Sequence, residues 1–193
     1  MKIGLFGGTF NPVHLGHLIL AQEAWFKLGL EKVIFVPAYI PPHKELEGDI
    51  SVADRLNLVR LSLEGDKRFE ISTYEIDAKG TSYSIDTIKH FRGKEKYAEL
   101  FFIIGSDSLE TLSEWKGIEE ILNLTVFVVG TRPGFGKTGP YEDKITRVDI
   151  PRTDISSSEI RRRIREKEPI DFLLKPAAVE YIRNKGLYLQ HSA

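Results

Sequence analysis

The chain has 193 residues, enough for one domain with a full hydrophobic core. Its 27 basic and 28 acidic residues nearly balance, so overall charge favours neither nucleic acid nor a membrane surface as a partner. The absence of cysteine excludes disulfides, thiolate catalysis and cysteine zinc sites, and no apolar run reaches the length of about 18 residues that a transmembrane helix needs. With no signal-like segment before the first strand, we expect a cytoplasmic protein.

Short apolar runs alternate with amphipathic runs in the first half of the chain. Lys2–Phe6 predicts a strand, and the residues from Leu15 to Leu28 recur near helical spacing before Gly29. The continuous apolar run Val33–Val36 is typical of a strand buried on both faces. The next expected elements are an irregular segment at Pro37–Lys44, a helix capped by Ser51 that ends near Gly65, and a short strand at Phe69–Ser72.

The second half continues the alternation. After a loop through Lys79–Thr81, the pattern predicts a helix around Ile85–Phe91 capped by Ser82 or Ser84, then a buried strand at Leu100–Ile104. The remaining expected elements are helical pieces at Leu109–Leu112 and Ile118–Leu122, strands at Val126–Val129 and Ile145–Ile150 separated by an exposed loop at Gly130–Pro140, and helices at Ser157–Lys167 and Pro176–Lys185.

This order predicts right-handed βαβ units and a single α/β domain over residues 1–193. We expect a Rossmann-like, doubly wound and mostly parallel sheet with helices on both faces, closed by a C-terminal helical segment at 155–193. Ligands of such sheets bind beyond the carboxyl ends of the strands. Gly7–His17, Pro37–Lys44 and Gly105–Asp107 should therefore meet at one edge.

Gly7–His17 joins the first strand to the first helix through a glycine-rich turn. Backbone N–H groups and the positive end of the helix dipole converge there and favour an anion. His14 and His17 lie three residues apart, on one face of the helix start, and both can donate hydrogen bonds. The stretch predicts a phosphate site.

A second anion site is indicated near the other end of the chain. Ser156 and Glu159 fit a capping box, yet Arg161–Arg163 follow within the first two turns, where positive charge is unfavourable. A bound anion would offset this conflict. Two such helix starts suit a polyphosphate better than a single phosphate. Gly130–Thr138 imitates a phosphate-binding P-loop, but its glycine spacing is one residue too long and Gly139-Pro140 interrupts the helix that should follow.

These motifs identify a resemblance to the H-x-G-H nucleotidyltransferase superfamily and, within it, to the bacterial nicotinate-nucleotide adenylyltransferases. The superfamily motifs are Gly7–His17 and Ile155–Arg161, with Ser158 standing where threonine is common. The narrower resemblance rests on Pro41–Lys44, Ser82–Thr87, Gly105–Leu109 and Trp115-Lys116. It implies transfer of the adenylyl group of ATP to nicotinate mononucleotide, with Mg²⁺ held mainly by the phosphates and with no protein metal ligands.

The resemblance also implies the site residues. His14, His17 and Arg161 would be catalytic. ATP would contact Gly7, Gly8, Thr9, Phe10, His14, Gly16, His17, Gly105, Asp107, Ile155, Ser156, Ser157, Ser158 and Arg161. The acceptor would contact Lys44, Tyr83, Ser84, Thr87 and Trp115, with Trp115 as a stacking surface for the pyridine ring and the Tyr83–Thr87 helix start as donor to its carboxylate.

Other readings stay open at this point. Another adenylyl- or cytidylyltransferase of the superfamily, acting on nicotinamide mononucleotide or pantetheine phosphate, would share the phosphate motifs. A non-catalytic nucleotide sensor is a rival of a different class, although both histidines and Arg161 suit leaving-group contacts. A P-loop NTPase using Lys137 is a third reading.

Overall fold

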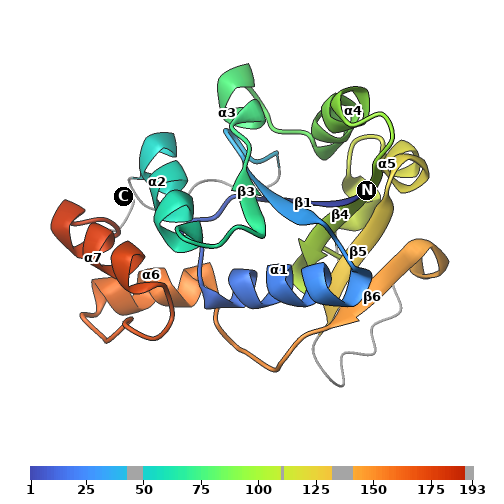
Figure 1. The fold of residues 1–193 in the computed structure, drawn as a ribbon. Coiled ribbons are helices and arrows are strands. Elements are labelled where there is room, and N and C mark those ends of the chain that lie inside the picture. Colours follow the sequence, from blue (N-terminus) through green and yellow to red (C-terminus); the bar gives the residue numbers. More distant parts are fainter. Residues whose placement is uncertain (43–49, 110, 132–140, 190–193) are drawn as a thin grey trace.

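The structure, a computed structural model, describes residues 1–42, 50–109, 111–131 and 141–189. Its centre is a parallel sheet in the order β3-β2-β1-β4-β5-β6, which is the doubly wound arrangement (Figure 1). The strands are β1 (Lys2–Gly8), β2 (Lys32–Pro37), β3 (Phe69–Ile71), β4 (Glu99–Gly105), β5 (Val126–Thr131) and β6 (Ile145–Asp149).

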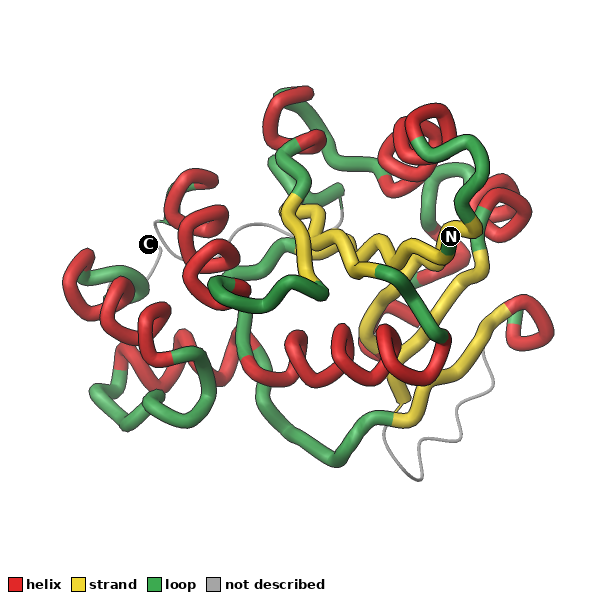
Figure 2. The backbone as a smooth tube through the Cα atoms, viewed as in Figure 1, coloured by secondary structure: helices red, strands yellow, loops and turns green. Residues whose placement is uncertain are grey.

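Helices cover both faces of the sheet (Figure 2). They are α1 (Leu15–Leu28), α2 (Val52–Leu63), α3 (Tyr74–Ala78), α4 (Ser84–Lys94), α5 (Ile118–Leu124), α6 (Ser157–Arg165) and α7 (Pro176–Lys185). Short 3-10 turns occupy Ser106–Leu109, Leu112–Glu114 and Glu142–Lys144. None of the helices in the described ranges is long and apolar enough to span a membrane.

Alternation along the strands divides the core in two. In β4, Phe101 and Ile103 pack with α1, α2, α6 and α7, whereas Leu100, Phe102 and Ile104 pack with α4 and α5. A strand buried on both faces needs apolar residues at every position, which is why this run carries no polar alternation. The predicted fold class is confirmed.

Several local expectations were wrong. The segment before Lys79 forms α3, a helix of only five residues that is too short to show helical periodicity. The helical piece expected around Leu109–Leu112 takes the form of two 3-10 turns, one ending at Leu109 and the other beginning at Leu112. Neither Ser82 nor Ser84 caps α4: Tyr83 occupies the cap position without a side-chain bond, and Ser82 accepts a hydrogen bond from the Tyr39 N–H at 2.8 Å.

Candidate active site

The turn between β1 and α1 is held tightly by its glycines. A Cβ at Gly8 would come within 3.0 Å of the Phe10 ring, and a Cβ at Gly16 within 3.0 Å of His14 Nδ1. Phe10 itself is buried and adopts a left-handed backbone conformation with φ of 48°. Gly8 and Gly16 are therefore required by close approach, which lets the backbone of the turn wrap around the Phe10 ring.

The two histidines lie against each other at the start of α1. Their ring centroids are 3.7 Å apart, and the backbone N–H of His14 donates to His17 Nδ1 at 3.1 Å. Because Nδ1 of His17 accepts this bond, the proton of the neutral imidazole lies on Nε2. The contact therefore fixes the His17 tautomer that donates from Nε2. The Phe10 and His17 rings also pack against each other in a T-shaped arrangement, with 5.3 Å between their centroids.

His14 is the more buried partner. Its side chain is 8% exposed, and its Nδ1 finds no hydrogen-bond partner among the described residues. Burial lowers the pKa of His14 from 6.5 to about 4, so the imidazole is neutral at pH 7. As a neutral ring it is a hydrogen-bond donor to an anion without contributing charge.

Acidification is expected to weaken the fold through His14. Between pH 6.5 and 4 the unfolded chain binds a proton at this residue that the folded chain does not, so stability is full above pH 6.5 and falls below it. From pH 7 to pH 5 the His14 contribution amounts to about 2 kcal/mol. Urea unfolding at both pH values should show a smaller loss for His14→Gln than for the wild type. Equal losses in both proteins would contradict this prediction.

The start of α6 docks on the same turn. Ser157 Oγ donates to the Pro12 carbonyl oxygen at 2.9 Å, and Arg161 Nη1 donates to the Asn11 carbonyl oxygen at 2.7 Å. Figure 1 shows the beginnings of α1 and α6 next to each other although about 140 residues separate them in the sequence. The two helix starts that the sequence predicts as anion sites thus lie in contact with each other.

The arginines of α6 have different roles. Arg162 and Arg163 form ion pairs with Glu159, and Arg162 also pairs with Glu166 and Glu168. Hydrogen bonds from Arg162 and Arg163 hold the pKa of Glu159 well below its ordinary value. Arg161 instead is 7% exposed and turns toward the Asn11–Pro12 segment. Only Arg161 therefore belongs to the predicted anion site, and its neighbours are compensated on the helix surface.

The α6 serines complete the helix start. Ser156 Oγ accepts the Glu159 N–H at 3.2 Å, which confirms the predicted cap. The Ser158 hydroxyl oxygen lies 3.1 Å from the Ser156 hydroxyl oxygen. The Ile155 carbonyl oxygen lies 3.5 Å from where a Cβ of Gly16 would be, so this residue is also at the α1–α6 contact.

Three of the predicted acceptor residues, Tyr83, Ser84 and Thr87, lie at the start of α4. Thr87 is fully buried, and its hydroxyl donates to Glu75 Oε1 at 2.5 Å; burial raises the pKa of Glu75. The Thr87 hydroxyl therefore bonds α4 to α3 within the core. The sequence-based expectation that this hydroxyl contacts the acceptor was wrong. Because no side chain caps α4, the N–H groups of Ser84 and Ile85 are the donors at this helix start.

Trp115 lies on the same side of the sheet as α4. Its ring, half-buried, meets Phe102 and Phe127 edge to face at 6.2 and 6.1 Å. The neighbouring Lys116 places its ammonium 4.2 Å from the Tyr83 ring centroid, which joins Trp115-Lys116 to the α4 start. The Trp115 ring is thus partly packed against the core and partly accessible.

Gly105 is the last residue of β4. A Cβ at Gly105 would meet no atom within 4 Å, although Ser106 next to it is buried. The side chain of Asp107, Lys44 and residues 132–138 of the P-loop-like segment lie outside the described parts of the structure. Among the described residues, a side chain at position 105 would thus meet no neighbour, and Gly105 joins the α1–α6 contact and α4 in the set of residues at this end of the sheet.

Arg55 is a further residue of the site region that the sequence pattern did not indicate. This α2 residue is fully buried, with Nη1 donating to the Thr9 carbonyl oxygen at 2.7 Å and Nη2 to the Tyr39 carbonyl oxygen at 3.0 Å. Arginine is seldom fully buried, and the helical pattern of α2 gave no sign of it. The one indication of its burial is its place in the helix. Arg55 follows Asp54 of the Ser51 cap and lies three and four residues before the buried Leu58 and Val59, on the same face.

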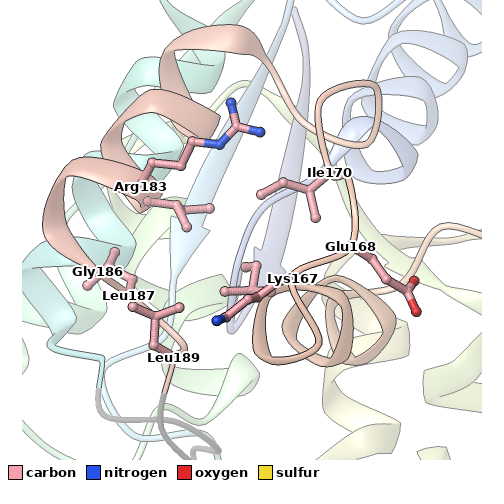
Figure 3. A pocket seen from close by; sticks show the side chains of 9 residues that line it. Lys167, Glu168, Ile170, Arg183, Gly186, Leu187 and Leu189 are labelled. Carbon is pink, nitrogen blue, oxygen red and sulfur yellow. The ribbon is translucent and has the colours of Figure 1, made fainter.

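A pocket of about 270 Å³ lies apart from this site (Figure 3). It opens between the end of α6, the following segment and α7, with Lys167 and Arg183 beside apolar side chains; Glu168 points away from it. None of the predicted site residues lines this pocket. Among the described residues, no cluster of three or more metal-ligating side chains occurs either.

Known proteins similar to this chain are nucleotidyltransferases. Residues 5–163 match the cytidylyltransferase-like family. The probable nicotinate-nucleotide adenylyltransferase of Halalkalibacterium halodurans is 44% identical over 188 residues, which cover 97% of this chain and 91% of that protein. The nicotinate-nucleotide adenylyltransferase of Bacillus subtilis is 37% identical over 187 residues, covering 97% of this chain and 98% of that protein.

A solved structure supports the fold. The nicotinic acid mononucleotide adenylyltransferase of Plasmodium falciparum, complexed with NaAD, superposes with a TM-score of 0.81 at 19% sequence identity. The similarity covers 97% of each chain. It shows that the whole described chain follows one architecture shared with that enzyme.

Proposed function

Because the chain belongs to the nicotinate-nucleotide adenylyltransferases, which transfer the adenylyl group of ATP to nicotinate mononucleotide in NAD biosynthesis, we propose how its site performs this reaction. The proposal rests on one observation, the docking of the α6 start on the Asn11–Pro12 segment through Ser157 and Arg161. This contact brings two helix N-termini to one place, and together they match the charge and length of a triphosphate.

The triphosphate lies across the α1 and α6 starts in this proposal. His14 and His17 donate to it from the α1 side, with His17 Nε2 nearest the transferred α-phosphorus. Ser156 and Arg161 hold the β- and γ-phosphates from the α6 side, where Ser157 contributes its backbone N–H because its hydroxyl donates to Pro12. The N–H groups of the Gly7–Phe10 turn contribute further donors. These groups stabilise the charge that develops on the α-phosphate and on the leaving pyrophosphate.

The acceptor phosphate is itself the nucleophile. It attacks the α-phosphorus in line, the bond to the bridging oxygen breaks, and pyrophosphate leaves with that electron pair; no protein base or covalent intermediate is needed. Trp115 provides the surface on which the pyridine ring stacks, and the Ser84 and Ile85 N–H groups receive its carboxylate. Lys44 is proposed to add a cation near the phosphates, and Asp107 to contact the ribose or the waters of the metal.

Magnesium fits this site as a companion of the substrate. The described donors around the α1–α6 contact are imidazole, hydroxyl, guanidinium and N–H groups, which bind anions and offer Mg²⁺ no carboxylate shell. Phosphate oxygens would hold the ion, which supplies positive charge to the leaving pyrophosphate when bound. The protein's part is to hold and orient the triphosphate.

Comparing two acceptors tests the acceptor half. With ATP and Mg²⁺, we expect pyrophosphate release with nicotinate mononucleotide and a kcat/KM lower by about tenfold or more with nicotinamide mononucleotide, because only the former places a carboxylate at the α4 start. Steady-state pyrophosphate release measures both. Equal kcat/KM values would remove the proposed role of Ser84 and Ile85. No release with either acceptor from folded protein would overturn the reaction itself.

A further inference from the structure

Arg55 is a buried cation that the reaction described above does not use. Its side chain is 0% exposed, and no carboxylate in the described part of the chain pairs with it. Its Nη1 and Nη2 donate to backbone carbonyl oxygens, those of Thr9 and Tyr39. Burying a guanidinium costs free energy unless its hydrogen bonds offset the loss of water. We therefore take the bonds to Thr9 and Tyr39 as the reason for an arginine at this position.

The bond to Thr9 determines where the next N–H points. In a trans peptide the C=O and the following N–H point in opposite directions, so a Thr9 carbonyl turned toward Arg55 directs the Phe10 N–H away from it. The Phe10 N–H meets no hydrogen-bond acceptor within the described ranges. Arg161 and Ser157 bind the Asn11 and Pro12 carbonyl oxygens of the same turn. The carbonyl groups of this turn are thus occupied by side chains.

The bond to Tyr39 reaches the acceptor side. Tyr39 follows β2, and its N–H donates to Ser82 Oγ at 2.8 Å, just before α4. The Ser82 N–H in turn donates to the Ile40 carbonyl oxygen at 2.8 Å. Arg55 therefore joins the phosphate-binding turn, through one planar guanidinium, to the segment that is bonded to the start of α4.

We propose that Arg55 is a positioning residue that turns the Phe10 N–H toward the triphosphate and sets the distance between the ATP and acceptor halves of the site. This inference rests on the proposed placement of the triphosphate. The planar fork of arginine holds both carbonyl oxygens at once, whereas a lysine ammonium at this position reaches one of them. Arg55 acts through Thr9 and Tyr39 and does not itself contact a substrate.

The first experiment compares Arg55→Met and Arg55→Lys with Arg60→Met, a control at an exposed position of the same helix. At a temperature where melting curves show each variant folded, we expect Arg55→Met to lower kcat/KM by about 10–100-fold for both substrates, because misplacement by about 1 Å has effects of this size. Arg55→Lys should fall between Arg55→Met and the wild type, and Arg60→Met should match the wild type. A folded Arg55→Met protein with wild-type kcat and KM values would show that Arg55 only stabilises the fold, and would overturn the inference.

A second measurement decides the matter if Arg55→Met does not fold. The backbone amide resonance of Phe10 in the wild-type protein is followed by NMR during titration with Mg-ATP, with the Gly93 amide of α4 as reference. A shift of the Phe10 resonance that saturates with ATP binding, and that is reduced in Arg55→Lys, supports the inference. Normal ATP binding and turnover with an unchanged Phe10 resonance would overturn the Arg55 inference and leave the proposed reaction standing. Failure of the wild type to bind ATP overturns the triphosphate proposal as well.

Discussion

Replacing His17 with alanine is expected to lower kcat by about 10²–10³-fold, the usual effect of removing one donor that acts in the transition state. The His14 N–H bond to His17 Nδ1 fixes the ring and leaves the proton on Nε2, so the donor is already oriented before substrate arrives. Pre-orientation is what makes such a donor effective, because no reorganisation is needed as charge develops. Single-turnover formation of the dinucleotide measures the chemical step.

The control for His17 is His90→Ala. His90 is an exposed residue of α4 that stacks on Tyr74, with 3.9 Å between ring centroids, and has no part in the proposed site. This variant should retain wild-type kcat. If His17→Ala kept kcat and raised only KM for ATP, His17 would bind the ground state and the transition state equally, and its assignment to the transferred phosphorus would be wrong.

The strands and the doubly wound, mostly parallel sheet class could be predicted from local sequence patterns, whereas the strand order is known from the structure. Val33–Val36 and Leu100–Ile104 are apolar at every position because both faces of β2 and β4 are covered, and their burial can be predicted without tertiary information. α3 could not be predicted in this way. Its Glu75 is buried and accepts hydrogen bonds from Thr87 and Ser82 of a later segment, and neighbours in sequence do not reveal such a contact.

The same distinction applies to the site. The spacing of Ser156 and Glu159 predicts a helix start, and in the structure Ser156 caps α6 there. Which of Arg161, Arg162 and Arg163 turns inward depends on where Glu159, Glu166 and Glu168 lie in space, so the run of three arginines alone does not decide it. Arg55 shows the limit most clearly, because its partners are backbone carbonyl oxygens and these carry no sequence signal.

Arg161 carries the second large prediction. Its guanidinium holds the Asn11 carbonyl oxygen through Nη1 and is nearly buried at the α1–α6 contact, so it both fixes the turn and presents positive charge to the leaving pyrophosphate in our proposal. Arg161→Lys retains the charge but loses the planar fork, and a single ammonium cannot serve the carbonyl oxygen and a phosphate in the same geometry. We expect kcat/KM for ATP to fall by about 10²-fold or more.

Arg163→Lys is the matched control for Arg161→Lys. Arg163 lies two residues further along α6 and pairs with Glu159 on the surface, at 2.8 Å between Nε and Oε1. Exposed ion pairs contribute little, so this variant should keep wild-type kcat/KM and melting temperature. Wild-type kcat/KM in Arg161→Lys would mean that charge alone is required at this position. The α6 start would then attract the triphosphate without orienting it, and in-line placement of the α-phosphorus would depend on the α1 turn and its histidines.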